Sequence, residues 1–274
     1  MSPDRCHTFR ALHDAGCFVM PNPWDCGSAR LLEGLGFKAL ATTSAGFGWS
    51  RGKADNRVTL DEVLTHLRAI VSSVSVPVNA DFEGGFATDA AGVAVNVAAA
   101  IATGIAGLSI EDSTGDGAHP LVEFALSVER MRAAKRAVDE SRSGVVLTGR
   151  SEGFIVGRPD LRETIRRLTA YAEAGADCLY APGIRHVADM ATVVRELAPK
   201  PVNALVYSDF TTVAELADIG VRRISVGGAL ARTAYTSFVQ AAQEIASAGT
   251  FAGLANTGPR LDFDGEFGSR APDT

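Results

Sequence analysis

The chain has 274 residues, of which 46% are hydrophobic and 21% charged, and its formal net charge is −6. This composition is typical of a globular protein with a sizeable core, and the lack of any basic cluster argues against nucleic acid or a membrane as partner. The four cysteines show no CxxC spacing, and the N-terminal segment has no apolar signal core. We therefore expect free thiols and a cytoplasmic location.

One short pattern recurs along the chain: a glycine, three residues, then Leu or Ile at the start of an apolar run. It begins at Gly36, Gly104, Gly175 and Gly220. Glycine after a helix adopts the left-handed conformation at little steric cost, so each copy predicts a helix-to-strand connection. The word PVNA also occurs twice, at 77–80 and 201–204, as expected for equivalent strands in a repeating fold.

Eight short apolar runs alternate with periodic helical segments, which predicts parallel strands covered by helices. We expect a (β/α)8 TIM-type barrel over residues 1–249, with a doubly wound open sheet as the alternative, and a tail without its own core over 250–274. The predicted strands are 17–20, 39–43, 76–81, 107–111, 144–149, 178–181, 201–206 and 223–226.

Acidic residues follow two neighbouring predicted strands, where a barrel places its active site. Asn79 and Asp81 lie two residues apart, so their side chains share a face at a spacing of about 6.6 Å. Glu111 ends the next strand, roughly 4.8 Å away. Two carboxylates this close favour a cation between them, and oxygen ligands without nearby His or Cys indicate Mg²⁺, with Mn²⁺ possible.

The remaining polar strand ends predict where a substrate binds. Arg150 has the planar fork that suits a carboxylate, and Ser44, Ala45 and Gly46 form a turn that can bind oxygens. Asn203 occupies the second PVNA strand and, with Asn79, is expected to orient the ligand. These residues predict a small dianionic 2-oxo acid, with Asp81, Glu111 and Arg150 as the catalytic group.

Each of these residues also has a structural interpretation. Arg150 could be an ion-pair partner, Glu111 part of a solvated loop, and the two asparagines could bond each other. We expect Glu83 to face solvent and His66 to lie on a helix surface. Asp25 is expected to cap a helix rather than bind a metal.

Four stretches, PVNADFEGGFA, GLSIEDSTGD, LTGRSEGF and NPWDCGSARLLEGLGFKAL, resemble the isocitrate lyase/phosphoenolpyruvate mutase superfamily, in order from about Phe18 to Ala248. The resemblance implies a barrel whose last helix is swapped between subunits of a dimer or tetramer, a bound Mg²⁺ and an enolate intermediate. It implies metal binding by Asp81 and Glu111, and by Asp55 in the loop after strand 2. It implies substrate binding by Arg150 and by Ser44, with Thr43 as the alternative.

The sequence departs from this superfamily at three points. Asn79 replaces the first acid of the metal-binding DxD, and a neutral oxygen donor binds Mg²⁺ more weakly. The loop 113–119 lacks the cysteine and lysines of isocitrate lyases, and 181–183 read Ala-Pro-Gly where the superfamily has glutamate or histidine.

We therefore expect a Mg²⁺-dependent lyase that cleaves a C–C bond of a small 2-oxo (di)carboxylic acid, by decarboxylation or retro-aldol cleavage. The alternatives are a phosphonopyruvate mutase or hydrolase, a non-catalytic keto-acid-binding protein, and an aldol-type transferase related to ketopantoate synthesis.

Overall fold

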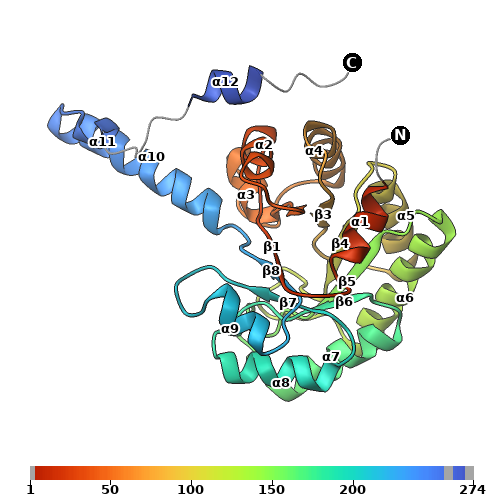
Figure 1. Ribbon diagram of the computed structural model, residues 1–274. Helices are drawn as coiled ribbons and strands as arrows, with labels where there is room; N and C mark the ends of the chain where they lie inside the picture. Colours follow the sequence, from red (N-terminus) through yellow and green to blue (C-terminus); the bar gives the residue numbers. More distant parts are fainter. Residues whose placement is uncertain (1–3, 256–261, 269–274) are drawn as a thin grey trace.

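The computed structural model describes residues 4–255 and 262–268, and its centre is one sheet of eight parallel strands. The strands pair in the order β1-β8-β7-β6-β5-β4-β3-β2, and a hydrogen bond from the Ala41 amide to the Pro21 carbonyl oxygen (3.0 Å) joins the two edges. The predicted (β/α)8 barrel is thus confirmed (Figure 1). The strands are β1 Phe18–Met20, β2 Leu40–Ala41, β3 Val78–Asp81, β4 Gly107–Glu111, β5 Val146–Arg150, β6 Cys178–Tyr180, β7 Val202–Leu205 and β8 Arg223–Ser225.

Helices surround this barrel, and most begin at a capping side chain. Asp25 caps its helix as expected, because its carboxylate accepts from the Ser28 amide. The helices are α1 Arg5–Ala11, α2 Cys26–Gly34, α3 Ser44–Ser50, α4 Leu60–Ser73, α5 Ala90–Ile101, α6 Phe124–Ser141, α7 Leu161–Glu173, α8 Val187–Leu197, α9 Val213–Asp218, α10 Ala229–Ala248, α11 Ala252–Ala255 and α12 Phe263–Gly268.

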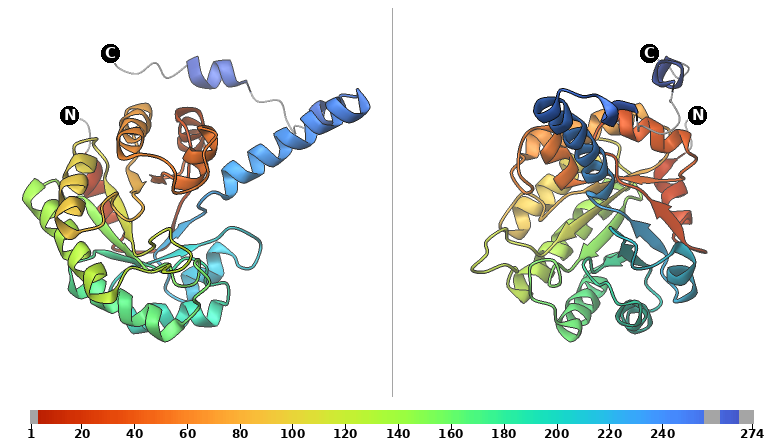
Figure 2. Two further views of the ribbon diagram at one scale, coloured as in Figure 1. Left: turned by 180° about the vertical axis from the view of Figure 1, so that it is seen from behind. Right: turned by 90° about the vertical axis from the view of Figure 1, so that its left-hand side faces the viewer.

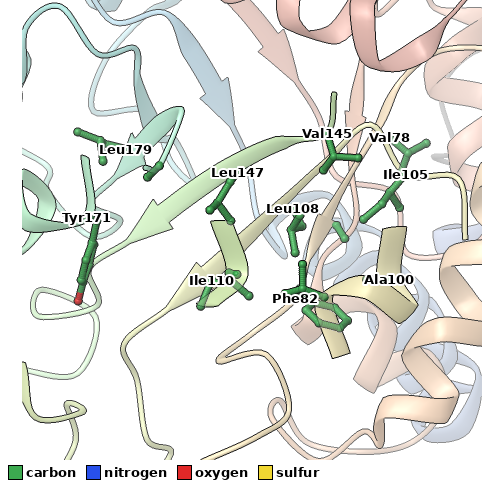
Figure 3. Close-up of a cluster of buried hydrophobic side chains, with 14 of the residues drawn as sticks. Val78, Phe82, Ala100, Ile105, Leu108, Ile110, Val145, Leu147, Tyr171 and Leu179 are labelled. Atoms are coloured by element: carbon green, nitrogen blue, oxygen red, sulfur yellow. The ribbon is translucent and has the colours of Figure 1, made fainter. Parts of the chain in front are cut away.

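Strand alternation divides the side chains between two environments. Val78, Leu108 and Leu147 point toward the helices and join the main buried cluster, together with Phe82 just past β3 (Figure 3). Residues of the opposite parity, such as Asp81, line the barrel interior. The apolar face fixes the register, and the register in turn sets which polar residues meet at the mouth.

The N-terminal end of the barrel is closed by α1. Its Phe9 is fully buried and packs with Met20 and Val146 in a second apolar cluster. Gly107 leaves room for this ring, because a Cβ atom there would lie 2.5 Å from Phe9 Cε1 and 2.6 Å from Asn79 Oδ1. The contact of Phe9 and Asn79 with Gly107 therefore leaves no room for a side chain at position 107.

We expect Gly107→Ala to lower the free energy of unfolding by about 1–3 kcal/mol, because the added methyl overpacks this contact. Urea denaturation would measure the loss. Gly117→Ala is the matched control, since a Cβ at Gly117 meets no atom within 4 Å. Equal stability of the two variants would contradict the packing at the base.

Two half-buried histidines couple stability to pH. Burial lowers the pKa of His66 to about 4, and burial together with the Arg223 charge lowers the pKa of His13 to about 3. His66 was expected on a surface; instead its ring stacks on Phe47 with centroids 3.9 Å apart. This expectation was wrong because His66 packs from α4 onto Phe47 of α3.

Each histidine takes up a proton on unfolding once the pH falls below about 6.5, while the folded state stays neutral down to the lowered pKa. The two neutral histidines therefore contribute fully to the free energy of unfolding above about pH 6.5. This contribution is lost as the pH falls, at up to about 1.4 kcal/mol per pH unit for each residue. We expect His66→Gln to reduce the loss between pH 7 and pH 5, measured by urea denaturation. An unchanged pH slope would contradict the assignment.

The last long helix, α10, leaves the barrel. Figures 1 and 2 show it projecting from the barrel wall, and Ala231 is its one buried residue. It exposes Phe238, Val239 and Ile245. Further on, the Phe267 carbonyl oxygen of α12 accepts from Arg30 Nη2 at 2.8 Å, which holds α12 against α2. No helix of the described ranges is long and apolar enough to cross a membrane.

Candidate active site

Arg150 is the centre of the barrel mouth. It ends β5, and its guanidinium contacts three carboxylates: Asp81 Oδ1 at 3.1 Å, Glu111 Oε2 at 3.3 Å and Glu152 Oε1 at 2.5 Å. Although burial acts to lower the pKa of Arg150, these carboxylates raise it well above its usual value. Asp81 and Glu111 do face one small volume, and the cation between them is the Arg150 Nη1 group.

Asp81 connects this cluster to the loop after β2. Its Oδ2 accepts from the Ser44 amide at 2.9 Å, and its own amide donates to Thr42 Oγ1 at 2.9 Å. The Ser44 side chain also lies beside Asp55 and acts to lower the pKa of that carboxyl, against burial and Asp81, which raise it. The structure thus brings Ser44, Asp55 and Asp81 together, as the resemblance implied.

The same loop leaves fewer amides for a ligand than expected. The Gly46 amide already donates to Thr43 Oγ1 at 3.3 Å, where Thr43 caps α3, and the Ser44 amide is occupied by Asp81. Of the Ala45 and Gly46 amides that were expected to bind ligand oxygens, the Gly46 amide is thus engaged in helix capping. Ala45 lines the cavity from the first turn of α3, where amides lack intrahelical partners.

Glu83 is part of the site rather than of the surface. Its Oε1 atom is buried without a hydrogen-bond partner in the described chain. Burial and the neighbouring Asp81 and Asp55 carboxylates raise the pKa of Glu83 to about 8. The solvent-facing expectation was wrong because Glu83 adopts a left-handed backbone conformation (φ 45°) that strand alternation does not predict.

The mouth therefore carries an excess of acid. Five carboxyl groups, Asp55, Asp81, Glu83, Glu111 and Glu152, surround one arginine. Burial also raises the pKa values of Glu111 and Asp55, the first offset only in part by Arg150. Carboxylates so arranged either share protons or bind a cation, and their oxygens suit a hard divalent ion.

This donor set fits Mg²⁺ by charge and chemistry. In the described ranges, no three acid, His or Cys side chains already converge in the arrangement of a metal centre. Waters would therefore complete any coordination, as Mg²⁺ commonly requires.

Two cavities meet at Asp55. An axial cavity of about 190 Å³ extends down the barrel interior between Ser44, Arg150 and Asn203. An outer cavity of about 840 Å³ lies over β3 and β4, where Glu83 and Glu111 line it. The acid cluster stands between the two, so a small ligand in the axial cavity would meet Arg150 at its mouth.

The asparagines do not bond each other. Asn79 Nδ2 donates to the Ala80 carbonyl oxygen at 3.2 Å, and its Oδ1 is buried without a partner in the described chain. Asn203 instead bonds Ser225 and Arg223. Asn79 lines the axial cavity, whereas its Oδ1 atom lies beside Gly107.

Sequence reasoning missed three residues of the interior: Glu152, Tyr180 and Arg223. Arg150 lies over the Tyr180 ring at 5.1 Å, and Glu152 is 3% exposed. Side chains alternate between the two faces of a strand. This alternation, applied onward from Arg150 and along the predicted strands 178–181 and 223–226, could have placed Glu152, Tyr180 and Arg223 inside the barrel.

Asp112, next to Glu111, has a different role. Its carboxylate accepts from the Glu152 amide (2.7 Å), from Tyr171 Oη (2.7 Å) and from Arg167 Nη1 (3.2 Å). It fastens the loop after β5 to α7 and so holds Glu152 in place.

Fold and site together define a (β/α)8 enzyme with an acid and arginine cluster at the carboxyl ends of its strands. A family model described as phosphoenolpyruvate phosphomutase matches residues 9–246. The chain belongs to this family, within the isocitrate lyase/phosphoenolpyruvate mutase superfamily, whose members are carbon–carbon lyases or mutases.

Individual proteins with similar sequences or structures are consistent with this family assignment. An uncharacterised protein of Mycobacterium tuberculosis is 32% identical over 222 residues, covering 80% of this chain and 81% of its own. An oxaloacetate decarboxylase of Bradyrhizobium diazoefficiens is 29% identical, covering 72% of each chain. The crystal structure of a candidate lyase/mutase from Burkholderia cenocepacia superposes with a TM-score of 0.94 at 44% identity, covering 98% of this chain and 97% of that one.

Proposed function

We propose that this protein is a Mg²⁺-dependent lyase that cleaves a C–C bond of a small 2-oxo dicarboxylic acid, by decarboxylation or retro-aldol cleavage. The observation that carries the proposal is Arg150, held among Asp81, Glu111 and Glu152 at the mouth of the axial cavity. The oxaloacetate decarboxylase among the relatives supports the choice of substrate class.

Asp81, Glu111 and Asp55 would hold the ion, largely through water. When bound, Mg²⁺ supplies Lewis-acid stabilisation of the negative charge that develops on a carbonyl oxygen. Mn²⁺ could replace it, because the same oxygen donors suit both ions.

The protein's own groups would position the substrate. Arg150 presents guanidinium N–H groups toward a substrate carboxylate, and the Tyr180 ring beneath it limits where the guanidinium can move. Asn79 and Asn203 line the cavity and would act as neutral partners that orient the ligand. Glu83, with a pKa of about 8, is suited to hold or release a proton near neutral pH.

The test is a panel of 2-oxo acids with Mg²⁺ and with EDTA, following release of pyruvate. We expect oxaloacetate or a close analogue to be cleaved and EDTA to abolish the reaction. Turnover unaffected by EDTA would overturn the metal-dependent mechanism. Phosphate or phosphoenolpyruvate formed from phosphonopyruvate would favour a mutase or hydrolase, and ligand binding with no turnover would favour a keto-acid-binding protein.

We further propose a cytoplasmic homodimer or tetramer in which α10 packs on a second copy of the chain. The exposed Phe238, Val239 and Ile245 support this, because a 20-residue helix with one buried residue lacks a packing partner in its own barrel. Light scattering of the purified protein would measure the assembly.

A further inference from the structure

A second arginine lies inside the barrel, below the site. Arg223, the first residue of β8, is 1% exposed and lines the axial cavity. It donates to Asn203 Oδ1 from Nε (2.9 Å), to Thr148 Oγ1 from Nη2 (3.1 Å) and to His13 Nε2 from Nη1 (3.3 Å). All three partners are neutral.

The His13 partner is neutral for a structural reason. Its Nδ1 lies 2.8 Å from the Phe9 carbonyl oxygen and must donate to it, which leaves Nε2 as the acceptor facing Arg223. No carboxylate in the described part of the chain forms an ion pair with Arg223. This contrasts with Arg150, which three carboxylates surround at the other end of the same cavity.

Burying a charge without a counter-ion lowers the stability of the folded protein. The presence of the Arg223 guanidinium inside the barrel therefore calls for an explanation. Arg223 also fixes the direction of a hydrogen-bond chain. A guanidinium can only donate, so Asn203 must accept with Oδ1 and direct its amide hydrogens elsewhere. Asn203 Nδ2 donates to Ser225 Oγ at 2.9 Å, and Ser225 Oγ donates in turn to Tyr180 Oη at 3.4 Å.

This series of hydrogen bonds ends at Tyr180 Oη, a donor that has no acceptor among the described residues. Tyr180 Oη accepts from Ser225, so its own hydrogen remains for another group, and the second amide hydrogen of Asn203 likewise has no partner among the described residues. Asn203, Ser225, Tyr180 and Arg223 all line the axial cavity. The floor of the cavity therefore combines a positive charge with hydrogen-bond donors.

We propose that Arg223 is a specificity-determining positioning residue: it orients Asn203, Ser225 and Tyr180 so that the floor of the axial cavity binds a carboxylate. The inference rests on the proposed function and deepens it. It assigns the second carboxylate of a dicarboxylic substrate to the floor, with the first at Arg150. A monocarboxylate of equal size would leave the Arg223 charge uncompensated.

The test compares succinate with succinamate, which have nearly the same shape but differ by one charge, by calorimetric titration of the full chain in the presence of Mg²⁺. We expect the wild type to prefer succinate by about tenfold or more. Arg223→Met should remove this preference, while Arg223→Lys should retain part of it. A purely structural role would weaken both ligands alike.

Asn203→Asp provides a second variant in case Arg223→Met does not fold. Its carboxylate would pair with Arg223 inside the barrel, so the melting temperature should not fall, yet the preference for succinate should disappear. A wild type without preference, or a preference that survives in Asn203→Asp and in a folded Arg223→Met, would overturn the inference.

These outcomes separate the inference from the proposed function. A wild type that prefers the dianion but cleaves no 2-oxo acid would refute the activity and support the role of Arg223. Cleavage of oxaloacetate together with equal affinity for succinate and succinamate would support the activity and refute that role.

Discussion

Replacing Arg150 by lysine is expected to lower kcat/KM at least about 100-fold, even though the charge is retained. Arg150 contacts Asp81 and Glu111 through Nη1 and Glu152 through Nε, and an ammonium group cannot span these positions at once. Loss of one preorganised donor at a reacting oxygen commonly costs about 10²–10³ in rate. Steady-state assays on the substrate that the panel identifies would measure the effect.

The stability of this variant should also change, because a carboxylate left without its partner in a buried cluster is destabilising by about 3–5 kcal/mol. Arg166→Lys is the matched control. Arg166 pairs with Glu163 on the exposed face of α7, and such pairs contribute little. Equal activity of the two variants would show that Arg150 is structural rather than part of the reaction.

The fold was predictable because its signals are local. Glycines such as Gly36 and Gly104 end helices through the left-handed conformation that few other residues adopt readily, and both have positive φ here. Strand alternation then placed Asp81, Glu111 and Arg150 at one end of the barrel, where their side chains meet.

The site was less predictable wherever it depends on distances between elements. Nothing local in the sequence shows that Arg150 occupies the space between Asp81 and Glu111, since this depends on side-chain reach across three strands. Glu83 was missed because its backbone leaves the extended region at the end of β3. Arg223 was missed because a charged residue at the start of an apolar strand usually faces solvent, whereas here it enters the barrel.

Replacing Glu111 or Asp81 at the barrel mouth by the corresponding amide should change the stability of the protein by different amounts. Burial raises the pKa of Glu111 well above its usual range, so removing its charge relieves an unfavourable desolvation that Arg150 offsets only in part. Glu111→Gln should therefore change the stability in EDTA by less than about 1 kcal/mol. Asp81→Asn should cost more, since its amide nitrogen would face the donors of Ser44 or Arg150.

Both substitutions are nevertheless expected to weaken Mg²⁺ binding at least about tenfold, because each removes an anionic oxygen donor that the ion would otherwise recruit. Calorimetric titration of Mg²⁺ and thermal melting in EDTA measure the two quantities separately. Asp139→Asn, at an exposed pair with Lys135 on α6, is the control and should leave both unchanged. If Glu111→Gln proved the more destabilising variant in EDTA, or if neither variant altered Mg²⁺ affinity, the acid cluster would be a proton-sharing structural network rather than a cation site.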